Sequence, residues 1–189
     1  MTLDLDQRRR LEGFAFLAAF AACVPAANWL IGNVGAVCVP QGPCLIPVAP
    51  GLSAPSGVLM VGLALVLRDL VQRRLGPLWS AGAILAGALL SALFAPPALV
   101  IASTVAFLIS EFADMAVYTP LQRRGLVLAA VASSIVGLAV DSVAFLTLAF
   151  GSLDFLGGQI VGKAWMVLLA LPALYWLRQR DARLGLAPA

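Results

Sequence analysis

Two carboxylates, Glu111 and Asp114, interrupt the mostly apolar segment FLISEFADMAVY at residues 107–118. Spacings of three and four residues place them on one face of a helix, together with the rings of Phe107 and Tyr118. Carboxylates among apolar residues pair with cationic side chains, accept hydrogen bonds from a ligand or exchange protons. The segment therefore predicts a polar site inside an apolar environment.

The composition of the chain identifies this environment as a membrane. Of the 189 residues, 62% are hydrophobic and 11% are charged, and the mean hydropathy is +1.00, far from the usage of a soluble domain. The sequence has three cysteines and no histidine, so we expect no metal site and no cofactor. It also lacks a GxSxG motif and a phosphate-binding glycine loop, and we therefore expect that the protein is not an enzyme.

Six apolar stretches are long enough to cross a bilayer as helices of about 20 residues. They lie at about residues 11–31, 53–70, 78–95, 97–118, 126–150 and 157–177. The predicted fold class is an all-α membrane protein, a compact bundle of six transmembrane helices that forms a single domain over residues 1–189. Stripes of small residues at helical spacing, Ala83, Gly87 and Ser91 in one span and Ser133 and Gly137 in another, predict close helix packing.

Arginines cluster at every second connection between these stretches, at residues 8–10, 68–74, 123–124 and 178–183. The positive-inside rule then places both termini in the cytoplasm. The net charge of +3 and the pI near 9.1 do not indicate a nucleic-acid partner, because the arginines form no continuous basic face. An alternative interpretation makes the first stretch a cleavable signal peptide; we keep it as a span, because its removal would leave five.

The connection at residues 33–52 is rich in proline and glycine, which predicts irregular backbone. Cys38 and Cys44 lie in this connection. On an oxidising membrane face they form either a disulfide or two free thiols, and the sequence leaves both alternatives open.

The ionisable and amide residues inside the spans fall into two groups by depth, counted at 1.5 Å per residue from the outer ends of the spans. The outer group lies about 8 to 13 Å deep and contains Asn28, Asp141 and Lys163. The inner group lies about 20 Å deep or slightly more and contains Arg68, Asp69, Glu111 and Asp114. Opposite charges at matching depths predict either ion pairs, of Asp141 with Lys163 and of Arg68 with Glu111 or Asp114, or a polar solute site, and both remain open. Arg68 and Asp69 are the candidates for a structural or gating role.

A cavity with polar edges and aromatic walls is the functional alternative. Its candidate residues are Asn28, Trp29, Phe107, Glu111, Asp114, Asp141, Gln159, Lys163 and Trp165. Carboxylate, amide and ammonium groups beside flat rings fit a flat heterocycle that carries several hydrogen-bond donors and acceptors. Each of the aromatic rings also has a simpler interpretation, as lipid-facing or interfacial packing.

Several stretches of the chain match a known pattern. They are IASTVAFLISEFADMAVYTPLQRRG, ASSIVGLAVDSVAFLTLAFG and GQIVGKAW, preceded by AANWLIGNVG and PSGVLMVGLALVLRDLVQRRLG. Together they resemble the queuosine precursor transporter family, also called the vitamin uptake transporter family or YhhQ-like proteins. The resemblance runs from Asn28 to Trp165 and is most specific in SEFAD-x-x-VY and VDS-x-x-F.

This resemblance implies a six-helix fold similar to the substrate-binding S-components of energy-coupling-factor vitamin transporters. It also implies a bacterial inner-membrane importer of 7-deazaguanine precursors of queuosine, 7-cyano-7-deazaguanine (preQ0) and 7-aminomethyl-7-deazaguanine (preQ1). The polar motif residues of the family correspond to Asn28, Arg68, Asp69, Ser110, Glu111, Asp114, Asp141, Ser142, Gln159 and Lys163. Ser142 thereby joins the expected substrate-binding residues.

The expected partners are a small deazapurine substrate and the lipid bilayer, with no nucleic acid. A homo-oligomer and an energising ATPase module both stay open. Two alternatives remain for the function: an S-component-like uptake protein for a different vitamin or nucleobase-like solute, and a membrane scaffold whose ion pairs serve only packing.

Overall fold

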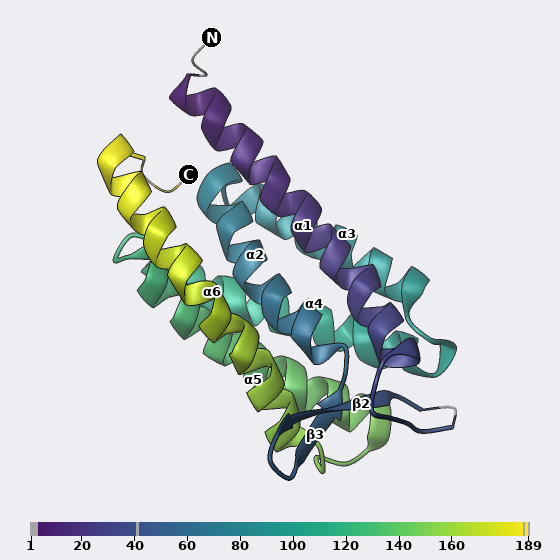
Figure 1. Ribbon diagram of the computed structural model, residues 1–189. Coiled ribbons are helices and arrows are strands. Elements are labelled where there is room, and N and C mark those ends of the chain that lie inside the picture. Colours follow the sequence, from purple (N-terminus) through teal and green to yellow (C-terminus); the bar gives the residue numbers. More distant parts are fainter. Residues whose placement is uncertain (1–3, 41, 187, 189) are drawn as a thin grey trace.

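The computed structural model describes residues 4–40, 42–186 and 188. Its six α-helices are α1 (Leu5–Asn33), α2 (Val58–Leu75), α3 (Pro77–Phe94), α4 (Val100–Leu121), α5 (Leu126–Phe150) and α6 (Leu156–Leu184), and a short 3₁₀ helix, Pro97–Leu99, precedes α4. They form one bundle with both termini at one end, called here the terminal end, and the strands at the other, called here the sheet end (Figure 1). The predicted bundle of six helices is confirmed.

Helix α2 lies inside the bundle, between α1 and α6 (Figure 1), and also packs against α3 and α5. Within the described residues, the other five helices are long and apolar enough to cross a membrane. Helix α2 differs because it carries Arg68, Asp69, Arg73 and Arg74, all of which are buried. Surrounding helices shield these charges from lipid, whereas the outer helices expose large apolar side chains such as Leu78, which is 87% exposed.

Single glycine and proline residues set the sharp turn between α2 and α3. Gly76 has a φ of +95°, a backbone conformation that glycine adopts without steric cost, and it is the only residue between the two helices. Pro77 then begins α3, where its missing N–H group is no loss. The turn brings α3 back antiparallel to α2, so that it contributes to the same interior.

A three-stranded antiparallel sheet covers the sheet end. It consists of β1 (Val37–Cys38), β2 (Cys44–Ala49) and β3 (Leu52–Pro55) in the order β1-β2-β3. The expectation of irregular backbone at residues 33–52 is wrong here, because Gly51 at a φ of +73° makes the turn that pairs β2 with β3. The same pairing explains why the second helix begins at Val58, whereas the second predicted span begins at residue 53.

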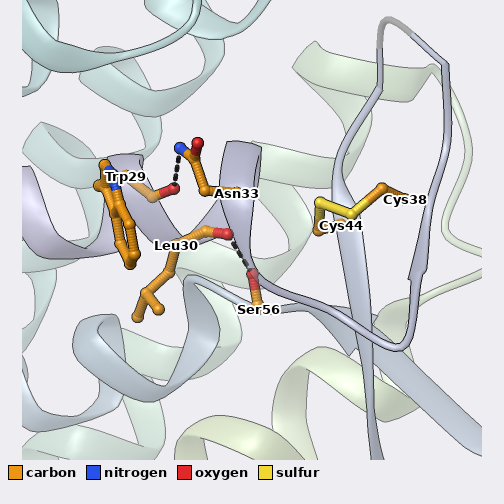
Figure 2. Close-up of a disulfide and its surroundings, with 6 residues drawn as sticks. All are labelled: Trp29, Leu30, Asn33, Cys38, Cys44 and Ser56. Carbon is orange, nitrogen blue, oxygen red and sulfur yellow. Dashed lines mark hydrogen bonds between the residues drawn. A yellow bond between two sulfur atoms is a disulfide. The ribbon is translucent and has the colours of Figure 1, made fainter.

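A disulfide within the sheet and a hydrogen bond to α1 stabilise this end of the molecule (Figure 2). Cys38 and Cys44 are partners in the β1–β2 register and are joined by a disulfide. The Ser56 hydroxyl donates a hydrogen bond of 2.7 Å to the Leu30 carbonyl oxygen near the end of α1. The disulfide therefore ties β1 to β2, and the hydrogen bond ties the segment that leads into α2 to the end of α1.

Candidate functional site

A cavity of about 70 Å³ lies among the helices near the sheet end. We call it the sheet-end cavity. All six helices and β3 contribute to its wall, which is mostly apolar; its polar lining residues are Asn28, Ser91, Ser103, Asp141 and Gln159. An apolar hollow with a few convergent polar groups is the usual form of a small-molecule site.

Close helix packing shapes the cavity. Phe107 lines it and also packs against Phe20, with 6.0 Å between ring centroids. The ring fits there because Gly87 on α3 has no side chain: a Cβ atom at that position would lie 2.6 Å from the Phe107 ring. Gly62 on α2 likewise faces the backbone of Lys163, where a Cβ atom would lie 2.6 Å from the carbonyl oxygen. The small residues thus act through packing, which positions the polar side chains of α4 and α6.

Gln159 lines the cavity and carries a hydrogen-bond acceptor without a partner among the described residues. Its side chain is 2% exposed, and its Oε1 atom has no hydrogen-bond partner among the described residues. A buried acceptor without a partner is unfavourable by about 1–3 kcal/mol. A ligand with an N–H group in the cavity would remove that penalty. Asn28, by contrast, donates its amide hydrogen to the Val24 carbonyl oxygen over 3.0 Å.

Asp141 connects the cavity to a buried ion pair. Its Oδ2 atom accepts a hydrogen bond of 2.6 Å from Nζ of Lys163, which also donates to Oγ of Ser142 over 2.8 Å. The Ser110 hydroxyl donates to Oδ1 of Asp141 over 3.3 Å. The pair holds one negative and one positive group. Asp141 also lines the cavity, and each oxygen of a carboxylate can accept more than one hydrogen bond.

A second set of buried charges surrounds Arg68; it comprises Arg68, Asp69, Glu111 and Asp114, and we call it the Arg68 cluster. Nη2 of Arg68 forms an ion pair with Oδ1 of Asp114, and it lies 2.7 Å from Oδ1 of Asp69 without the alignment of a hydrogen bond. Nε of Arg68 donates to Oε2 of Glu111 over 3.3 Å. Each of the four side chains is at most 2% exposed. One guanidinium group therefore faces three carboxyl groups.

Neutral side chains complete this cluster. Gln72 accepts a hydrogen bond of 3.0 Å from Nη1 of Arg68 and donates one of 2.9 Å to Thr119. Ser133 on α5 donates to Oδ2 of Asp69 over 2.9 Å. The guanidinium carbon also lies 5.6 Å from the centroid of the Tyr118 ring, a cation–π geometry. Side chains from helices α2, α4 and α5 therefore meet in the Arg68 cluster.

The residues expected to bind substrate occupy three places. Asn28, Phe107, Asp141 and Gln159 line the sheet-end cavity. Lys163 is not among the lining residues but donates to both Asp141 and Ser142, and Glu111 and Asp114 belong to the Arg68 cluster with the expected ion-pair residues Arg68 and Asp69. Trp29 and Trp165 are the exceptions.

The structure places Trp29 and Trp165 outside the cavity lining, with 58% and 49% of their surfaces exposed. The indole N–H group of Trp165 donates to the Val48 carbonyl oxygen over 3.0 Å, so this ring braces β2. Successive helix residues are rotated by about 100° around the axis. A tryptophan next to Asn28 or two residues past Lys163 consequently points in a different direction from that residue. The expected stacking of these two rings on a ligand therefore gains no support from the sheet-end cavity.

Two further sets of residues were missed by the sequence analysis. Ser103 lines the cavity, and its spacing of four residues from Phe107 was the signal that could have found it. At the terminal end an ion network joins α1, α2 and α6: Asp181 lies 2.9 Å from Nε of Arg73 and 2.7 Å from Nη2 of Arg74, and Glu12 lies 2.6 Å from Nη2 of Arg180. The signal that could have found this network is the position of Glu12 and Asp181, each a single acid next to a cluster of arginines.

A family model described as "Putative vitamin uptake transporter" matches residues 56–177, nearly two thirds of the chain. The matched range contains the Arg68 cluster, Asp141, Gln159 and Lys163. No curated protein and no solved structure matches the chain.

Proposed function

The chain belongs to the putative vitamin uptake transporter family, and from this premise we propose that it is an importer of the 7-deazaguanine precursors preQ0 and preQ1. As a multi-pass membrane protein of a transporter family, it requires a binding place for a small molecule between its helices. The sheet-end cavity supports this role. The observation that carries the proposal is that Gln159, whose buried Oε1 atom has no partner among the described residues, lines this cavity together with Asp141.

The chemistry of a deazaguanine complements these groups. Its N1–H group and exocyclic amine are adjacent donors, which a carboxylate such as Asp141 accepts together. In this proposal, Oε1 of Gln159 accepts a further ring N–H group, and the second amide hydrogen of Asn28 donates to the carbonyl oxygen of the ligand. The Phe107 and Phe145 rings line the same cavity and offer flat apolar faces to the bicycle.

Binding requires the cavity to widen. Small-molecule pockets are typically about 300–1,000 Å³, whereas the sheet-end cavity measures about 70 Å³. Met60 lines it, and a methionine side chain has three rotatable bonds that let it move aside. The structure therefore corresponds, in this proposal, to a contracted substrate-free state.

The proposed direction of transport runs from the sheet end to the terminal end. With both termini in the cytoplasm of a bacterium, as the arginine clusters predict, the cavity faces the outside of the inner membrane. The Arg68 cluster and the terminal-end ion network then lie between the cavity and the cytoplasm, and the helices must rearrange around them to release substrate.

Thermal unfolding of the purified protein in detergent tests the proposal, with preQ0, preQ1, guanine and a panel of vitamins as ligands. We expect preQ0 or preQ1 at micromolar concentration to raise the Tm of the wild type and of Asp154→Asn, because Asp154 is an exposed loop carboxyl. Asp141→Asn should lose the shift. A Tm shift with a vitamin alone would mean that the site binds that vitamin and not a deazaguanine. The absence of any shift would favour the alternative of a membrane scaffold whose ion pairs serve only packing.

A further inference from the structure

The Arg68 cluster carries more acidic than basic groups. Asp69, Glu111 and Asp114 all contact the one guanidinium group of Arg68. All four side chains are buried in the middle of the bundle. Were every carboxyl ionised, the cluster would hold two uncompensated negative charges, and burying an unpaired charge is strongly unfavourable.

The neighbouring elements supply no second positive charge to these carboxyls. On α6, Lys163 pairs with Asp141 of α5, and on α2, Arg73 and Arg74 pair with Asp181 at the terminal end. On α1, the buried Cys23 lines the sheet-end cavity and carries no positive charge. Across residues 4–40, 42–186 and 188, Arg68 is thus the only cation in ion-pair contact with Asp69, Glu111 or Asp114.

Unpartnered polar atoms at the cluster are a second, independent sign that something binds there. Tyr118 is fully buried with its ring against Arg68, yet its hydroxyl has no hydrogen-bond partner among the described residues. Oδ2 of Asp114 is also buried and without a partner in this part of the chain. A donor and an acceptor are therefore left open beside the excess carboxyls.

The chemistry of the cluster favours a proton over a metal ion. A bound alkali or divalent cation would have to sit beside the guanidinium group, whose like charge repels it. A proton instead attaches to one carboxyl and removes one negative charge while leaving the Arg68 contacts in place. It also turns a carboxylate oxygen into a hydrogen-bond donor.

Glu111 is the carboxyl best placed to exchange that proton. Its hydrogen bond from Nε of Arg68 is long, at 3.3 Å, whereas Asp69 lies 2.7 Å from Nη2 of Arg68 and also accepts a hydrogen bond from Ser133. It follows Ser110, which donates to Asp141, and lies one turn beyond Phe107, which lines the sheet-end cavity. A movement of α4 on substrate binding would reach Asp141 and Glu111 together.

We propose that the Arg68 cluster binds a proton at Glu111 and that release of this proton toward the terminal end is coupled to import. The coupling rests on the proposed function, whereas proton binding itself does not. The two parts are therefore tested separately.

Proton binding is tested on the substrate-free protein by measuring Tm in detergent between about pH 6 and 9. The folded cluster keeps a proton that an unfolded carboxyl gives up, so the folded state binds more protons and stability falls as pH rises. We expect this fall in the wild type and in Asp154→Asn. In Glu111→Gln, whose amide mimics the protonated acid, the fall should be less steep, by the amount that corresponds to about one bound proton.

Equal pH dependence in the wild type and Glu111→Gln would overturn proton binding at Glu111. If Glu111→Gln fails to fold, the wild type still decides, because a Tm that does not fall with pH removes the proposal. A matched Asp69→Asn variant, expected to retain the Glu111 proton, then serves as the second comparison.

Coupling is tested in proteoliposomes with labelled preQ1. An inward proton gradient should accumulate preQ1 severalfold in the wild type, and Glu111→Gln should bind preQ1 but only equilibrate it. Accumulation driven by a sodium gradient, or unaffected by Glu111→Gln, would overturn the coupling. Failure to bind preQ1 would defeat the proposed function, and the pH dependence of the substrate-free Tm would still decide proton binding.

Discussion

Two sets of buried charges inside the bundle differ in balance and in surroundings. The Asp141–Lys163 pair has one acid and one base, and Asp141 borders the sheet-end cavity. The Arg68 cluster has three acids and one base, and none of its members lines that cavity. The balanced pair is suited to present a carboxylate to a ligand, whereas the unbalanced cluster is suited to hold a proton.

Replacing Arg68 with methionine should separate the two regions most clearly. It leaves three buried carboxyls without their cation, so we expect a loss of about 3–5 kcal/mol in the free energy of unfolding. Unfolding by denaturant in detergent measures the loss. Adding Glu111→Gln and Asp114→Asn to Arg68→Met should recover part of it; a single Arg68→Met variant as stable as the wild type would contradict the cluster's charge imbalance.

Replacing Lys163 with methionine should cost less, about 1–3 kcal/mol in the free energy of unfolding, because Asp141 borders a cavity that water can enter. The same denaturant experiment measures it. Removing both charges, in Lys163→Met with Asp141→Leu, should restore most of the stability but not ligand binding. A loss as large as that of Arg68→Met would show that the two regions do not differ in the way proposed.

Two buried glutamines provide a matched test of the cavity. Oε1 of Gln159 and Oε1 of Gln122 both lack a partner among the described residues, but only Gln159 lines the cavity. Gln159→Leu should weaken preQ1 binding about tenfold, the value of one hydrogen bond. Isothermal titration calorimetry should find Gln122→Leu within about twofold of the wild type; equal losses in both would argue against direct contact with Gln159.

The smallest effect is expected at the exposed tryptophans. Trp29→Ala and Trp165→Ala remove rings that face away from the cavity, so the affinity for preQ1 should stay within about twofold of the wild type in the same calorimetric titration. A tenfold loss in either variant would mean that the ring moves into the site when substrate binds.

Depth along a helix could be predicted from the sequence because a helix rises by a constant 1.5 Å per residue. Counting therefore matched Arg68 with Glu111 and Asp141 with Lys163, the pairs that the structure brings into contact. The direction of a side chain around the helix depends on which face meets its neighbours. Asn28 and its neighbour Trp29 have nearly the same depth, but only Asn28 lines the cavity and Trp29 is exposed, a difference that depth alone does not predict.

Contacts that depend on tertiary pairing could not be predicted. Composition suggests a loop at residues 33–52, because proline and glycine are frequent there, but strand pairing through the Gly51 turn overrides it. The contact between Glu12 and Arg180 joins residues near opposite ends of the chain. No local spacing relates these two residues; they meet because α1 and α6 both pack against α2.

Filling the sheet-end cavity tests the central claim most directly. Ser103 lines the cavity and its neighbour Thr104 does not, so Ser103→Leu and Thr104→Leu form a matched pair on α4. Equilibrium dialysis with labelled preQ1 should show binding lost in Ser103→Leu and retained in Thr104→Leu. Wild-type affinity in a folded, monodisperse Ser103→Leu protein would contradict the assignment of this cavity as the substrate site.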